Sequence, residues 1–153
     1  MGSMERDRIV DQLRRAFAGE SWHGPAVEEV LEGMTAEIAR ARPIAAAHSI
    51  WEIVLHIAAW EDVVRRWIQG EKGTLTPEQN WPEVSDTSEA AWARALTTLR
   101  EGHGRLLEAA ARLHDEQLDE PLGEKAPSRY VLLHGVIQHD LYHAGQIAVL
   151  KKA

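Results

Sequence analysis

The chain has 153 residues and a net charge of −7, and it contains no cysteine. The acidic balance and the lack of a basic stripe argue against a nucleic-acid partner. Without cysteine there are no disulfides, thiolate metal sites or cysteine nucleophile, so nitrogen and oxygen atoms must hold any metal. No apolar run is long enough to span a membrane and no signal-peptide core is present, so we expect a cytoplasmic protein with no membrane partner.

Residues 4–153 are expected to form one domain with a sizeable core. Gly2 and Ser3 precede Met4 and are typical of a scar from an expression vector, so residues 1–3 are left out of the fold prediction. Four long segments have helical periodicity, and no segment alternates as a strand does. The first long helix is expected over residues 5–18, followed by a shorter helical piece after Pro25.

The other three long helices have clear start signals or regular apolar stripes. The second is expected over 49–69, because Ser49 and Glu52 form a capping-box pattern. The third follows a long linker, opens near Thr87 or Ser88 and continues to about Leu113, and the fourth begins at about Ser128. Four amphipathic helices predict an all-α four-helix bundle. The linker between the second and third helices is long enough to run back along a helix of about 30 Å, so that these two helices can be parallel in an up-down-down-up order. A short helix within the linker could instead take up that length.

The histidines are the main indication of function. His139 and His143 are four residues apart and therefore share one face of the fourth helix, and His56 lies on the apolar stripe of the second. A buried polar group without a partner costs roughly 1–3 kcal/mol, so several histidines that face one core favour a shared metal ion. The alternative is packing, since a lone buried histidine is more often a core residue bonded to a carbonyl or carboxylate.

Other polar residues near the stripes are weaker candidates. His103, on the stripe of the third helix, is predicted to be a pocket wall or a core residue, with a fourth metal ligand as the third possibility. Gln146 could hydrogen-bond in a pocket, and Glu52 could orient an imidazole, with helix capping as its alternative. Asp140 and Asp62 lie off the stripes and are expected to be solvated. Surface or capping roles are expected for the remaining histidines, which are His23, His48, His114 and His134.

Two segments resemble the signatures of the DinB-like (damage-inducible, YfiT-related) superfamily. They are HSIWEIVLHIAAWE at residues 48–61 and GVIQHDLYHAGQI at residues 135–147. The resemblance spans nearly the whole chain and implies a four-helix bundle of up-down-down-up topology, often a homodimer. It also implies a divalent metal, commonly nickel or zinc, held by one histidine of the second helix and two of the fourth. Those histidines are His56, His139 and His143 in this sequence.

Known members of that superfamily include thiol-S-transferases and thiol-dependent isomerases that use low-molecular-weight thiols such as bacillithiol, mycothiol or glutathione. The resemblance therefore implies a metal-dependent thiol-S-transferase or a related hydrolase, acting on an electrophilic small-molecule substrate. Three histidines would leave coordination positions open, as a catalytic metal requires. Glu52, Gln146 and His103 are the candidate pocket residues. The alternatives are a non-catalytic, dimeric metal-binding protein of a stress response and a purely structural bundle.

Overall fold

The computed structural model describes residues 4–153, and the expected vector scar at residues 1–3 lies outside them. Within the described residues the chain is helical and has no strand, only an isolated bridge between Pro121 and Ser128. The prediction of an all-α fold is confirmed. The helices are α1 (Glu5–Ala18), α2 (Val27–Leu31), α3 (Ala36–Arg40), α4 (Ile50–Ile68), α5 (Pro77–Asn80), α6 (Glu89–Ala111), α7 (Asp115–Leu118) and α8 (Arg129–Leu150).

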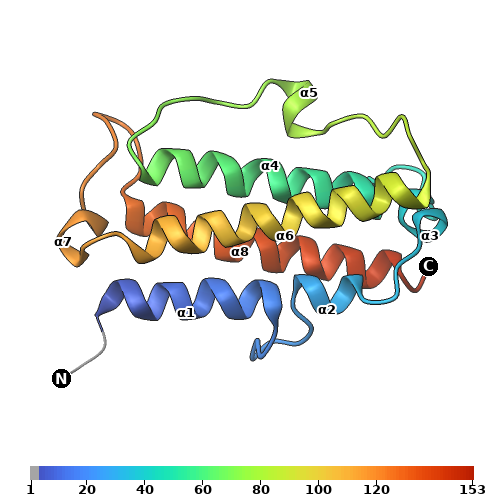
Figure 1. The fold of residues 1–153 in the computed structure, drawn as a ribbon, viewed down its shortest axis with the longest axis horizontal. Helices are drawn as coiled ribbons and strands as arrows, with labels where there is room; N and C mark the ends of the chain where they lie inside the picture. The colour runs from blue at the N-terminus through green and yellow to red at the C-terminus, as the bar shows by residue number, and fades with distance from the viewer. Residues whose placement is uncertain (1–3) are drawn as a thin grey trace.

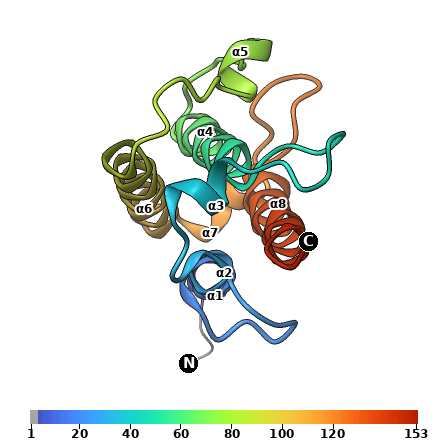
Figure 2. The same ribbon diagram turned by 90° about the vertical axis from the view of Figure 1, so that its right-hand side faces the viewer.

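The four long helices form a bundle in which α2 continues the line of α1. Figure 1 shows α4 and α6 running in one direction and α1 and α8 in the other, so the order along the chain is up, down, down, up. Figure 2 shows the same helices around a common axis, with α1 and α4 on opposite sides. Each of these two helices packs against both α6 and α8. The short helix α5 lies in the linker, outside α4 (Figures 1 and 2).

Serine residues start the three long helices after α1. Ser49, Ser88 and Ser128 each accept a hydrogen bond from a backbone N–H in the first turn, which satisfies one of the unpaired donors there. The Glu52 carboxylate accepts a hydrogen bond from the backbone N–H of Ser49, so the predicted capping box is confirmed. Glu52 also forms an ion pair with Arg42. Its carboxylate therefore caps the start of α4 and pairs with Arg42 there.

The core consists of two apolar clusters that follow each other along the bundle. One gathers buried residues of α2, α3, the first half of α4, the first half of α6 and the end of α8. The other gathers most of the buried face of α1 with the end of α4, the second half of α6 and the first half of α8. Between them, one core position on each of three helices is polar. These positions are Glu61 on α4, His103 on α6 and Asp140 on α8, and we call them the polar layer.

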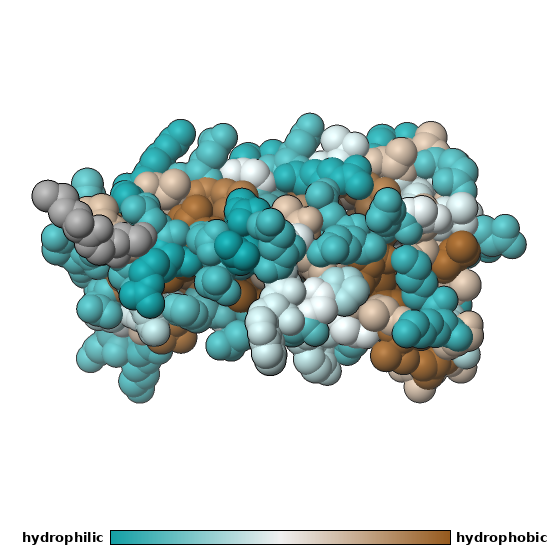
Figure 3. Space-filling model, turned by 90° about the horizontal axis from the view of Figure 1, so that it is seen from below, coloured by the Kyte–Doolittle hydropathy of each residue, from teal (hydrophilic) through white to brown (hydrophobic). Residues whose placement is uncertain are grey.

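The outside of the bundle is mixed in character. Figure 3 shows the face on which α1 and α2 lie, where hydrophobic areas are separated by hydrophilic side chains. Across residues 4–153, every helix is too short or too polar to cross a membrane.

Candidate metal centre

Three imidazoles from two neighbouring helices meet at one point beside the core. His56 comes from α4, and His139 and His143 come from α8. The Nε2 atom of His139 lies 3.1 Å from the Nε2 atom of His56 and 3.1 Å from that of His143. His56 and His143 are buried, whereas the side chain of His139 is 25% exposed. The three histidines singled out in the sequence are thus together, and one of them reaches the surface.

Hydrogen bonds on the far side of two rings fix which nitrogen atoms face this point. The Nδ1 atom of His56 lies 2.8 Å from the carbonyl oxygen of Asn80, and Nδ1 of His143 lies 2.7 Å from Oε1 of Gln146. Because these oxygens can only accept, both Nδ1 atoms carry the proton and both Nε2 atoms present a lone pair. Gln146 therefore has the pocket hydrogen bond that the sequence suggested for it.

The Nε2 atom of His139 cannot satisfy both neighbours. It faces two lone pairs but can carry one proton at most, so one 3.1 Å contact would join two lone pairs. A cation bound by all three Nε2 atoms removes this conflict. Neutral imidazoles with their second nitrogen hydrogen-bonded are also the usual protein ligands of divalent zinc and its neighbours. The donor set therefore fits a divalent metal ion.

Burial keeps two of these rings in the form that binds a metal. Removal from water lowers the pKa of His56 below its ordinary value of 6.5, and it lowers the pKa of His143 in the same way. The hydrogen bonds that the two rings donate to the oxygens of Asn80 and Gln146 raise these pKa values, and this is the smaller effect. Both imidazoles are therefore neutral at neutral pH, as metal coordination requires.

The linker between α4 and α6 supports the centre from outside. Trp81 stacks on His56 with ring centroids 3.8 Å apart, and its other face stacks on His48 at 3.6 Å. Asn80 bonds His56 through its carbonyl and accepts the Trp60 indole N–H through its side chain. We did not predict Asn80 or Trp81 as site residues. Their positions depend on how a non-periodic linker folds back over α4, which leaves no pattern in the sequence.

Replacing Gln146 by leucine should weaken metal binding by roughly 10–100-fold, the usual effect of losing an outer-shell partner. The substitution keeps the size of the side chain but removes the acceptor that orients His143. Competition with a chromophoric chelator measures the affinity. Gln138→Leu, at an exposed position of the same helix, is the matched control and should leave it unchanged. Equal affinities for the two variants would contradict the orienting role of Gln146.

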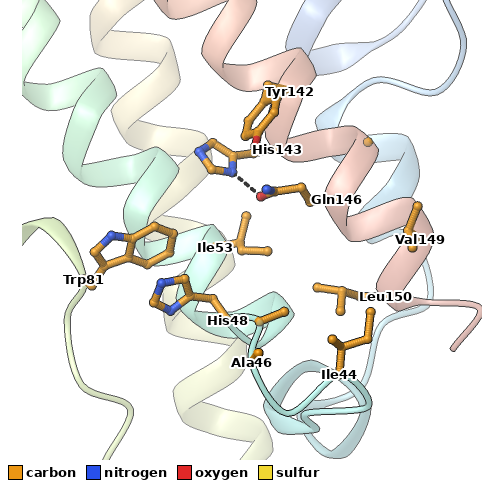
Figure 4. Close-up of a pocket in the computed structure, with 12 residues that line it drawn as sticks. Ile44, Ala46, His48, Ile53, Trp81, Tyr142, His143, Gln146, Val149 and Leu150 are labelled. Atoms are coloured by element: carbon orange, nitrogen blue, oxygen red, sulfur yellow. Dashed lines mark hydrogen bonds between the residues drawn. The ribbon is translucent and has the colours of Figure 1, made fainter.

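Two apolar cavities open on either side of the histidines. A cavity of about 670 Å³ is lined by His143, Gln146, Trp81 and His48, together with aliphatic side chains that Figure 4 shows around the same space. A smaller cavity of about 320 Å³ is lined by His139 and by residues of α4 and α8. Neither lining includes a lysine, arginine, aspartate or glutamate from the described part of the chain. The histidine group thus borders two apolar spaces.

A second polar group, the polar layer, lies inside the bundle. Glu61, His103 and Asp140 are buried, and one potential ligand atom from each lies within 4.8 Å of the others. The Nδ1 atom of His103 is 2.8 Å from Oε1 of Glu61, and the His103 ring stacks on Phe17 with centroids 3.8 Å apart. His103 is therefore a core histidine outside the three-histidine group, one of the two leading roles predicted for it.

The prediction that Asp140 is solvated is wrong, since its side chain is fully buried. Asp140 follows Ile137 by three residues and precedes Ala144 by four, which is the spacing of the buried stripe of α8. Glu61 was not predicted at all, although it sits four residues after Ile57 on the buried stripe of α4. The spacing of Glu61 and Asp140 from the buried apolar residues of their helices was therefore the feature of the sequence that indicated their burial.

Burial in the polar layer shifts the ionisation of all three side chains. It raises the pKa of Glu61 to about 8 and lowers the pKa of His103 to about 4. It also raises the pKa of Asp140 well above its usual range, and the nearby Glu61 charge adds to this effect. Without a bound cation, the folded protein therefore keeps protons on its buried carboxyls at pH values where an unfolded chain has lost them.

The metal-free protein should lose stability as the pH rises from about 6.5 to 8. The folded state holds the Glu61 proton up to about pH 8, whereas the unfolded chain loses it near 4.5, so stability falls through this window. His103, with its pKa lowered to about 4, has the opposite effect only below about 6.5. The Glu61 carboxyl alone contributes a slope of up to about 1.4 kcal/mol per pH unit, and the raised pKa of Asp140 acts in the same direction.

Urea denaturation at several pH values, with chelator present, measures this slope. Glu61→Gln should flatten it, because the amide does not titrate. Glu101→Gln, an exposed position on α6, is the control and should keep the wild-type slope. A wild-type stability that does not fall between pH 6.5 and 8 would show that the buried carboxyls are already ionised in this window.

His23, His114, His134 and Asp62 lie apart from both groups, whereas His48 lines the larger cavity and stacks on Trp81. His134 packs against Tyr130 on α8 and lines a surface cavity with residues of α1. His23 and His114 are exposed, and Asp62 forms ion pairs on the surface of α4. Glu52 remains at the start of α4 and does not line either cavity beside the histidines.

A four-helix bundle with three converging imidazoles between two adjacent helices places the chain among helical proteins with a candidate metal centre. The model of the DinB superfamily matches residues 21–147, which include both histidine-bearing segments. The chain belongs to the DinB superfamily, as its sequence signatures suggested. No curated protein and no solved structure was found to match the chain.

Proposed function

We propose that the protein binds a divalent metal, nickel or zinc, through His56, His139 and His143, and acts as a thiol-S-transferase or a related hydrolase of electrophilic small molecules. The convergence of three Nε2 atoms, two of them unprotonated by hydrogen bonding, is the observation that supports this proposal. Three protein ligands leave coordination positions open. A divalent ion held there would lower the pKa of a bound thiol or water.

The residues around the centre have separable roles in this proposal. Asn80 and Gln146 hold the rings of His56 and His143 so that Nε2 of each faces the ion. Trp81 covers one face of His56 and limits the access of water from that side. His139 is the most exposed of the three rings and lines a cavity of its own. The chain thus provides an oriented donor set with a partly open side.

The cavities support a reaction of two components. One borders His143 and the other borders His139, so a thiol and an electrophile could approach the centre from different sides. Both linings are largely apolar and lack cationic side chains, which favours uncharged, apolar electrophiles over phosphate esters. We therefore expect an aryl or alkyl electrophile to occupy the larger cavity.

A direct test uses protein purified without a metal-affinity column and loaded with nickel or zinc. Bacillithiol, mycothiol and glutathione are each combined with a chromogenic aryl halide, and a chromogenic ester tests hydrolysis. We expect turnover that requires metal and is lost in His143→Ala but kept in His114→Ala, an exposed histidine. Stoichiometric metal without turnover would instead favour the non-catalytic stress-response protein. A failure to bind metal would favour the structural bundle.

A homodimer also belongs to this proposal and rests on the family resemblance. Light scattering after gel filtration measures the mass of the particle. A mass equal to one chain, at the concentrations used for the activity test, would contradict it.

A further inference from the structure

Apart from His56 and His143 of the metal centre, the ionisable side chains that interrupt the buried stripes of the described helices are those of the polar layer. Glu61, His103 and Asp140 are 0%, 4% and 0% exposed, and they come from three different helices. Apolar residues precede and follow each of them on its helix, and these neighbours belong to the two separate apolar clusters. The layer therefore lies in the middle of the core and is closed off from water.

The hydrogen bonds within the layer leave most of its polar atoms without partners. The contact between His103 Nδ1 and Glu61 Oε1 is a well-formed hydrogen bond, and the carboxyl groups of Glu61 and Asp140 are close enough to interact with each other. Oε2 of Glu61, Nε2 of His103 and both carboxylate oxygens of Asp140 are buried and unpartnered. No lysine or arginine of residues 4–153 forms an ion pair with either carboxylate. Buried charges in this state cost several kcal/mol unless a counter-charge or a proton is present.

The geometry points to a second divalent-cation site formed by Glu61, His103 and Asp140. One ligand atom from each residue lies within 4.8 Å of the others, close to the spacing of ligands that share one ion at about 2.1–2.3 Å. Two carboxylates and one imidazole favour an ion such as Mn²⁺ or Fe²⁺, whereas three imidazoles favour zinc or nickel. Bundle cores hold such ions with Glu and His side chains from facing helices.

The two sites meet on α8, where His139 belongs to one and Asp140 to the other. The Nδ1 atom of His139 lies 4.0 Å from Oδ1 of Asp140 and has no hydrogen-bond partner of its own. The two sites nevertheless share no ligand residue. The second site can therefore be tested independently through Glu61 and His103, with the three-histidine centre left intact.

The test uses the full chain, refolded from urea with Mn²⁺ so that the ion can enter before the core closes, and with one equivalent of Zn²⁺ to fill the histidine centre. After gel filtration, elemental analysis counts both metals and electron paramagnetic resonance distinguishes bound from free Mn²⁺. We expect one retained Mn²⁺ per chain in addition to zinc. Glu61→Gln should reduce retained Mn²⁺ to none and keep the zinc, whereas His56→Ala should lose zinc and keep the Mn²⁺.

Glu101→Gln, the same substitution at an exposed position, is the control and should bind both ions. Circular dichroism checks that each variant folds, and His103→Gln replaces Glu61→Gln if the latter does not. Wild-type protein that retains no Mn²⁺ would overturn the proposal and show that protons alone neutralise the layer. Equal Mn²⁺ retention in the wild type and in a folded Glu61→Gln variant would overturn it as well. Either result leaves the function proposed for the histidine centre untouched.

Discussion

Replacing His139 by alanine should abolish stoichiometric binding of nickel or zinc at the three-histidine centre. Its Nε2 atom is 3.1 Å from the corresponding atoms of both His56 and His143, so its loss leaves one ligand on each of two helices. The loss of affinity should exceed the roughly 10–100-fold that follows removal of an outer-shell partner. Elemental analysis of tag-free protein, after incubation with metal and gel filtration, measures the stoichiometry.

His134→Ala is the matched control for this experiment, since it removes a histidine of the same helix that lies outside the group. Its metal content should equal that of the wild type. Circular dichroism of both variants verifies that α8 is intact. If His139→Ala binds as much metal as His134→Ala, the histidine group is a packing arrangement and the proposed function loses its support.

Trp92→Ala should have the largest effect on stability and lower the free energy of unfolding by about 3–5 kcal/mol. Trp92 is 2% exposed, packs against Trp51 at a centroid distance of 5.1 Å, and donates its indole N–H to the carbonyl oxygen of Met34. Truncation therefore opens a cavity and also leaves a buried carbonyl without its partner. Domains are typically stable by about 5–15 kcal/mol, so this is a large share of the total.

Urea denaturation followed by circular dichroism measures the change. Trp22→Ala is the control, because Trp22 is fully exposed and its truncation should alter stability by less than about 0.5 kcal/mol. A Trp92→Ala variant as stable as Trp22→Ala would mean that the contacts of Trp92 with Trp51 and Met34 contribute little to the bundle.

The helices could be predicted because their signals are local. The expected starts at Ser49, Ser88 and Ser128 agree with the structure, since a serine hydroxyl caps each helix through bonds to its own first turn. The linker was less predictable. Its helix α5, whose last residue Asn80 contacts His56, has no apolar face that repeats along the sequence.

The candidate site was predictable only in part, for a physical reason. Imidazoles on an apolar stripe stand out, and His56, His139 and His143 were found in this way. Asp140 was expected to be solvated because it lies off the stripe that contains His139 and His143, and Glu61 was not singled out. The stripe through His56 and Trp60 also lies to one side of the fully buried stripe that contains Glu61. The stripes drawn through the histidines thus differ from the faces of α4 and α8 that the structure buries most deeply.

The division of the core has a consequence for how the bundle opens. The polar layer separates two apolar clusters, so few apolar contacts at that level join the two ends of the molecule. Fluctuations that loosen one end can then proceed while the other end stays packed, as in the cooperative subunits seen by native-state hydrogen exchange. Such a partial opening would bring water and small ions to Glu61 and Asp140 without global unfolding. The polar layer, which divides the apolar core, would thereby also make its own carboxylates accessible to solvent.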